Sequence, residues 1–112
     1  MLEVALAAYE AVRLHDGLSY GLEAAAGLAL SGGRADEAAR LLGAADGLRE
    51  AVGVPIWGPR LIRFESLLAT VRGALREELF DRLWADGRAL GFEGALEAAR
   101  RVLAPAEPAA TS

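Results

Sequence analysis

The stretch ADEAARLLGAADGLREAV, residues 35 to 52, decides the fold of this chain. Its apolar residues recur every three or four positions, the spacing of one face of an α-helix. This face consists of Ala38, Leu41, Leu42, Ala45, Leu48 and Val52. The charged residues of the stretch, among them Glu37 and Glu50, fall mainly on the opposite side. The stretch is therefore expected to be an amphipathic helix with one face against a core.

The composition favours helices along the rest of the chain as well. The chain has 112 residues, enough for one domain or for a piece of a larger one, and 54% of them are hydrophobic, as in globular proteins. Alanine and leucine, which are strong helix formers, are the commonest residues, whereas β-branched residues are scarce. We therefore predict an all-α fold.

The same periodicity predicts five further helices, over residues 2–14, 18–31, 60–75, 76–90 and 92–103. His15-Asp16-Gly17 is expected to separate the first two, with Asp16 as a helix N-cap. Segment 18–31 is apolar nearly all the way round, so we expect it to be the most buried helix.

Short connections between these six helices indicate three antiparallel hairpins, paired in sequence order. They would form one helical domain over residues 1–104, followed by a disordered tail over residues 105–112. The first helix begins without a capping residue. We therefore expect the domain to be the end of a longer helical array.

The charge balance excludes several classes of function. Twelve basic residues, all of them arginine, and 16 acidic residues give a net charge of −4, which is no electrostatic footprint for nucleic acid. Without cysteine there is no disulfide and no thiolate metal site. The longest apolar run, residues 24–30, is far shorter than the ~20 residues of a membrane span. We expect a cytoplasmic protein that contacts neither membrane nor nucleic acid.

Two short motifs could suggest catalysis, but both lack the residues that their chemistry would need. Leu30-Ser31-Gly32-Gly33-Arg34 is similar to the signature motif of transporter ATPases, which works against a phosphate-binding loop; the chain has no such loop and no lysine. His15-Asp16 could belong to a metal-dependent hydrolase, but His15 is the only histidine. We expect a turn and a cap at these positions, no cofactor and no enzymatic activity.

Large side chains in the second half of the chain are expected to hold the helices together. Trp84 lies one turn after Phe80, so both face the same neighbouring helix, and Gly87 leaves room for a close helix approach. Leu42 and Phe64 lie on the apolar faces of their own helices. A ligand pocket that includes Trp84 is the less favoured alternative.

Four other residues form the expected partner surface. Leu2, Leu6 and Tyr9 make an apolar face on the first helix, which a neighbouring helix would cover. Trp57 lies in a loop flanked by prolines, and either folds over the core or is exposed for a partner, with packing favoured. We therefore expect the isolated chain to associate through residues 2–14.

Segment 18–50 has the length of a helix-turn-helix repeat, and its small and large residues match a degenerate tetratricopeptide pattern. The stretches ADEAARLLGAADGLREAVGVP and RFESLLATVRGALREELFDRLWADGRAL carry a wider resemblance. Over roughly residues 16 to 103 the chain resembles the tetratricopeptide-like domain of LuxR-type transcriptional regulators of the MalT kind, and of related signalling ATPases fused to nucleotide cyclases. That family usually has a serine and a second glutamate where Gly91 and Gly94 stand here.

The resemblance implies a tetratricopeptide-like repeat that serves as a regulatory scaffold and binds a protein partner or neighbouring domains of the same polypeptide. Two alternatives remain at this point. One is a helical bundle whose main activity is self-association into a homo-oligomer. The other is a ligand-binding domain with a groove near Trp57 and Trp84, which would require a deep pocket with convergent polar groups.

Overall fold

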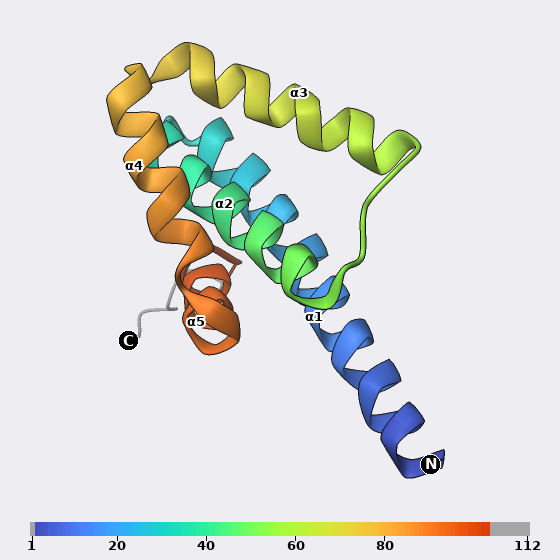
Figure 1. Cartoon of the computed structure of the whole chain (residues 1–112). Helices are drawn as coiled ribbons and strands as arrows, with labels where there is room; N and C mark the ends of the chain where they lie inside the picture. Colours follow the sequence, from blue (N-terminus) through green and yellow to red (C-terminus); the bar gives the residue numbers. More distant parts are fainter. Residues whose placement is uncertain (1, 104–112) are drawn as a thin grey trace, which may run out of the picture.

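The computed structural model describes residues 2–103, with side chains from Glu3 onward. This part of the chain contains helices and no strands, so the prediction of an all-α fold is confirmed. The tail expected over residues 105–112 lies outside the described residues. Five helices are present: α1 (Leu2–Ser31), α2 (Ala35–Val52), α3 (Pro59–Ala74), α4 (Glu77–Arg88) and α5 (Gly91–Leu103) (Figure 1).

Helix α1 is a single helix of 30 residues, so the break expected at His15-Asp16-Gly17 is wrong. Tertiary contacts hold these residues in helical conformation. The His15 ring packs against Phe92 of α5, with 5.0 Å between ring centroids, and Asp16 accepts a hydrogen bond from Arg60 of α3. A single glycine inside a helix costs only about 1 kcal/mol relative to alanine, and these contacts offset it.

Helices α1 and α2 form an antiparallel hairpin, and α2 is the centre of the molecule (Figure 1). The turn between them depends on Gly33, whose φ of 79° is unfavourable for other residues. Seven of the eight residues from Ala38 to Ala45 are buried, Arg40 being the exception. The expectation that segment 18–31 is the most buried is therefore wrong, because α2 has neighbours on more sides.

Helix α4 crosses α2 so closely that only glycine fits at the contact. A Cβ atom added to Gly87 would collide with the carbonyl oxygen of Arg40, and one added to Gly43 would collide with the carbonyl oxygen of Trp84. The two backbones touch directly at this point. Gly87 thus provides the close helix approach that the sequence indicated.

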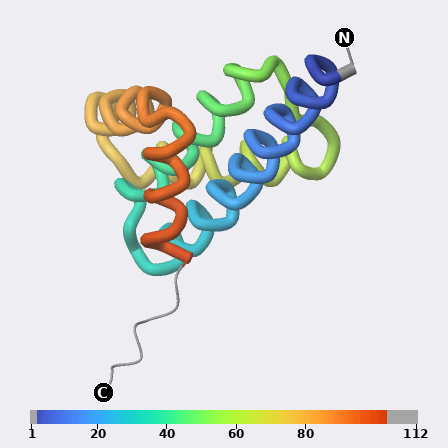
Figure 2. The backbone as a smooth tube through the Cα atoms, turned by 90° about the horizontal axis from the view of Figure 1, so that it is seen from below, coloured from blue at the N-terminus to red at the C-terminus, as the bar shows by residue number. Residues whose placement is uncertain are grey.

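The second half of the chain does not continue as simple hairpins. Helix α5 packs across α1 and α2 (Figure 2), and α3 reaches the body through α1 and α2 rather than through extensive packing against α4. Gly91, at φ 73°, allows the sharp change of direction into α5. Six helices in three sequential hairpins were expected, whereas the described residues form five helices, four of which gather around α2.

No helix in the part of the chain that the structure describes is long and apolar enough to cross a membrane.

Candidate functional site

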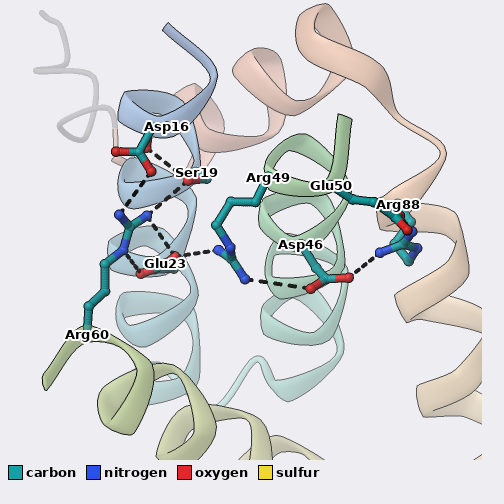
Figure 3. A network of polar contacts seen from close by, with 8 residues as sticks. All are labelled: Asp16, Ser19, Glu23, Asp46, Arg49, Glu50, Arg60 and Arg88. Atoms are coloured by element: carbon teal, nitrogen blue, oxygen red, sulfur yellow. Dashed lines mark hydrogen bonds and ion pairs between the residues drawn. The ribbon is translucent and has the colours of Figure 1, made fainter. Parts of the chain in front are cut away.

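A network of charged side chains joins four of the five helices (Figure 3). Its centre is a buried ion pair: Arg49 Nη1 of α2 donates to Glu23 Oε2 of α1 at 2.7 Å. The guanidinium of Arg49 also lies over the ring of Phe64 in α3, 4.6 Å from its centroid. The two side chains are thus satisfied by each other and by an aromatic face.

Arg60 attaches the beginning of α3 to α1. Its Nε donates to Glu23 Oε1 at 3.1 Å and its Nη2 to Glu23 Oε2 at 3.0 Å, a bidentate contact. The same guanidinium donates to Asp16 Oδ1 at 3.1 Å and to Ser19 Oγ at 3.0 Å. A planar guanidinium suits this arrangement, since its fixed fork can bind several oxygens at once.

The two arginines respond differently to their surroundings. Burial lowers the pKa of Arg49 below its ordinary value, although the charges of Glu23 and Asp46 oppose this effect. Burial also disfavours the charge of Arg60, but hydrogen bonds and charges from Glu23 and Asp16 outweigh it and raise the pKa of Arg60. Both guanidinium groups remain charged at neutral pH. The network therefore holds helices together through charge and does not transfer protons.

On the other side of α2 the network reaches α4. Arg88 forms ion pairs with Asp46 and Glu50, and Asp46 also lies 3.6 Å from Arg49. Within the described residues, every buried side-chain nitrogen or oxygen has a hydrogen-bond partner. The same residues hold no cluster of potential metal ligands. The arrangement can hold helices in place, but it presents no unpaired buried group to a substrate.

A groove of about 500 Å³ lies between the end of α2, the following loop and α3. Its apolar lining includes Ile56, Phe64 and Leu68, and its charged lining includes Asp46 and Arg49. These two charged groups are already paired with other side chains. Glu50, also in the lining, is paired with Arg88, which leaves Glu65 as the one charged lining residue outside the network. A single carboxylate is not the set of convergent polar groups that fixes a small ligand.

The residues of the expected partner surface lie at the exterior wherever their side chains are described. Leu6 and Tyr9 are 55% and 60% exposed on α1. Trp57 is 78% exposed, so it does not fold over the core. The side chain of Leu2 lies outside the described part of the structure.

The residues expected to hold the helices together lie in or beside the core. Leu42, Phe64, Phe80 and Gly87 are buried, and Trp84 is partly buried. Trp84 stacks on Phe80 with 5.7 Å between centroids and meets the edge of Phe64 at 6.5 Å. Trp57 does not join them, because it lines a separate hollow with Asp16 and Arg60. Neither the groove beside α3 nor the hollow at Trp57 has Trp84 in its lining.

Sequence reasoning missed the charged network. Glu23, Arg49 and Arg60 are far apart along the chain, and their partners belong to different helices. One signal was present: Glu23 is the only charged residue in the apolar segment 18–31. A lone charge on a face that must be buried indicates a buried partner of opposite sign.

The chain is similar to a short part of mycobacterial proteins that are named as transcriptional regulators. It is 36% identical over 100 residues to a protein of Mycobacterium bovis, and equally to proteins of two Mycobacterium tuberculosis strains, which bear the provisional name HTH-type transcriptional regulator. The match covers 87% of this chain but only 11% of each of those proteins. No family model and no solved structure matches the chain.

Proposed function

We propose that this chain is a regulatory scaffold segment of a larger bacterial transcriptional regulator. Its role is to hold a protein partner, or neighbouring domains of the same polypeptide, in a defined position. It contacts no nucleic acid and catalyses no reaction. The observation that carries the proposal is the similarity of nearly the whole chain to a short part of much longer HTH-type regulators.

The finer part of the proposal concerns the kind of scaffold. We place the chain with the tetratricopeptide-like domains of LuxR-type regulators of the MalT kind. Its support is the α1–α2 hairpin with a glycine turn, together with the close stacking of α4 on α2. The position of α3, which packs on α1 and α2 rather than extensively on α4, is a departure from a regular repeat. The hydrogen bonds of Arg60 maintain this position.

The charged network supports a scaffold rather than a binding cleft. Its residues belong to α1, α2, α3 and α4, so it fixes the relative positions of four helices. A buried ion pair contributes little net stability compared with apolar packing, but its directional hydrogen bonds favour one arrangement over others. A segment that transmits position between protein modules needs such a defined arrangement. Because a bacterial transcriptional regulator acts on DNA in the cytoplasm, we also propose that this segment is cytoplasmic.

A chimaera with a relative tests this function. In a Mycobacterium tuberculosis strain without the matching regulator, we would express that regulator with its matched segment replaced by this chain. The readout is the transcript profile. The chimaera is expected to restore the profile, whereas the regulator without the segment is expected not to.

An unrelated helical bundle of the same length, inserted at the same place, is the matched control. If the bundle restores the profile equally well, the segment is only a spacer and the proposal fails. The proposal also fails if the isolated chain binds promoter DNA in a fluorescence polarisation assay at physiological salt, because a scaffold segment is expected to show no such binding.

A further inference from the structure

The groove between the end of α2, the following loop and α3 follows one face of α3. Leu61, Phe64, Glu65 and Leu68 line it, at positions i, i+3, i+4 and i+7 of the helix. This is the spacing of a single helical face over two turns, about 10 Å of helix. Phe64 is buried, whereas Leu61 and Leu68 are only partly buried and Glu65 is exposed. The groove is therefore open to the exterior along this face.

Leu61 shows that the face is incompletely covered. Leu68 and Ile56, which also line the groove, pack against the buried core. Among the described residues, Leu61 lines the groove without packing against that core. An apolar side chain in this position is available to an occupant of the groove.

The charges around the groove are mostly acidic. Its lining holds the carboxylates of Asp46, Glu50 and Glu65 but only one guanidinium, that of Arg49. Asp46 and Glu50 already pair with Arg88, whereas Glu65 lies outside the charged network. An occupant that brings an arginine or a lysine to Glu65 gains an ion pair, and an acidic occupant is repelled.

We propose that this groove binds an amphipathic helix of a protein partner, with leucine-like side chains on one face and arginine or lysine beside them. This inference rests on the scaffold function proposed above, and it specifies the surface and the chemistry of the partner that the scaffold holds. The apolar face of the partner helix covers Leu61, Phe64 and Leu68, as in other cases where a helix lies in an apolar groove. A basic side chain at the edge of that face pairs with Glu65.

The lining of the groove disfavours other occupants. A small ligand needs several free polar groups that converge, and Glu65 is a single one. An extended peptide binds by adding a strand to the edge of a sheet, and residues 2–103 contain no strand. Nucleic acid is repelled by the carboxylates. A second copy of this chain has a net charge of −4, which is unfavourable beside an acidic groove.

Fluorescence polarisation with two synthetic peptides tests the chemistry of the occupant. Both peptides have 15 residues, blocked ends and a helical face of leucines. Arginines flank this face in the first peptide, and glutamates replace them in the second. The full chain is expected to bind the arginine peptide at least about fivefold more tightly at low salt, with a smaller difference at high salt. No binding of the arginine peptide, or equal binding of both, overturns the proposal.

Charge reversal tests whether the peptide lies in the groove. Glu65→Arg is expected to reverse the preference, so that the glutamate peptide binds more tightly. Glu78→Arg is the matched control, because it makes the same change of charge at an exposed carboxylate on α4, outside the lining of the groove. It is expected to keep the preference of the parent chain. The groove is not the binding site if both variants reverse the preference or if neither does.

Leu61→Ser tests the apolar part of the contact. It is expected to weaken binding of the arginine peptide about fivefold, because the leucine no longer covers apolar surface of the peptide. Ile62→Ser is the control, since Ile62 is the next residue, is 68% exposed and lies outside the lining of the groove. Circular dichroism checks that both variants keep the helical content of the parent. Equal affinities of the two variants would contradict the proposed contact.

Sedimentation velocity distinguishes a partner helix from a second copy of this chain. Any association of the parent chain is expected to be the same in Leu61→Ser. Dimerisation that is lost in Leu61→Ser and kept in Ile62→Ser would mean that the groove binds another copy, and the proposed partner would then be wrong. The chimaera tests the regulatory function separately, because a segment that holds its neighbours through another surface would still restore the transcript profile.

Discussion

The two halves of α1 are both rich in apolar residues but lie in opposite surroundings. In the second half Leu22, Ala25, Ala26 and Ala29 have no exposed surface, whereas residues 3–14, which we call the overhang, are exposed almost throughout. The helix is continuous between them. The neighbours differ, since α2 and α5 cover one half and no described helix covers the other. An apolar helix therefore indicates that a contact is needed, but it does not identify the contact.

The largest change is expected from removing the charge that fixes the covered half. Glu23→Ala leaves Arg49 and Arg60 without their shared carboxylate. Loss of one partner of a buried pair costs about 3–5 kcal/mol, so a comparable fall in the free energy of unfolding is expected in urea titrations. Glu10→Ala, on the overhang, should change it by less than about 0.5 kcal/mol. Equal effects of the two variants would mean that the two halves do not differ as described.

The next largest effect is expected at the crossing of α4 over α2. Gly87→Ala forces a Cβ atom into the carbonyl oxygen of Arg40, and overpacking of this kind costs about 3 kcal/mol. Gly73→Ala in α3 is the control, because an added Cβ there meets nothing within 4 Å. Thermal unfolding followed by circular dichroism should show a lower midpoint for Gly87→Ala only. An unchanged midpoint would show that α4 does not lie this close to α2.

The two tryptophans extend the comparison to covered and exposed aromatic residues. Trp84→Ala removes contacts with Phe64 and Phe80, and we expect a loss of about 2–3 kcal/mol, somewhat less than for a fully buried tryptophan. Trp57→Ala should leave the free energy of unfolding of the monomer nearly unchanged. Guanidinium titration of both variants at low protein concentration distinguishes them. Similar losses would place Trp57 in the core.

The smallest expected effect lies at the junction of the two halves. Gly17 is inside α1, and an added Cβ would meet nothing within 4 Å. Gly17→Ala should therefore stabilise the protein by about 0.5–1 kcal/mol through the better helix propensity of alanine. A calorimetric melting temperature above that of the parent would support the continuous helix. A lower one would mean that the chain does turn at this point.

Local pattern sufficed for some elements of the fold and failed for others. The predicted bounds of the helix over residues 35–52 agree with those of α2. The apolar stripe, the preceding Gly-Gly and the following glycine all indicate the same helix. The break at His15-Asp16-Gly17 was wrong, because contacts with Phe92 and Arg60 override the local preference.

The site was less accessible to sequence reasoning than the fold. Nothing near Arg49 and Arg60 in sequence reveals that both bind Glu23. The position of α3 against α1 and α2 depends on the same long-range hydrogen bonds. Local periodicity describes individual helices well, whereas the polar contacts between helices join residues 26 to 44 positions apart.

Because α1 is continuous through Gly17, its covered half and its exposed half move together as one helix. The base of the overhang is held by Arg60, which binds Asp16, and by Phe92, which packs on His15. A rotation of about 10° at that base carries a tip about 18 Å away sideways by about 3 Å. A small repacking around Leu22 is thereby magnified along the overhang.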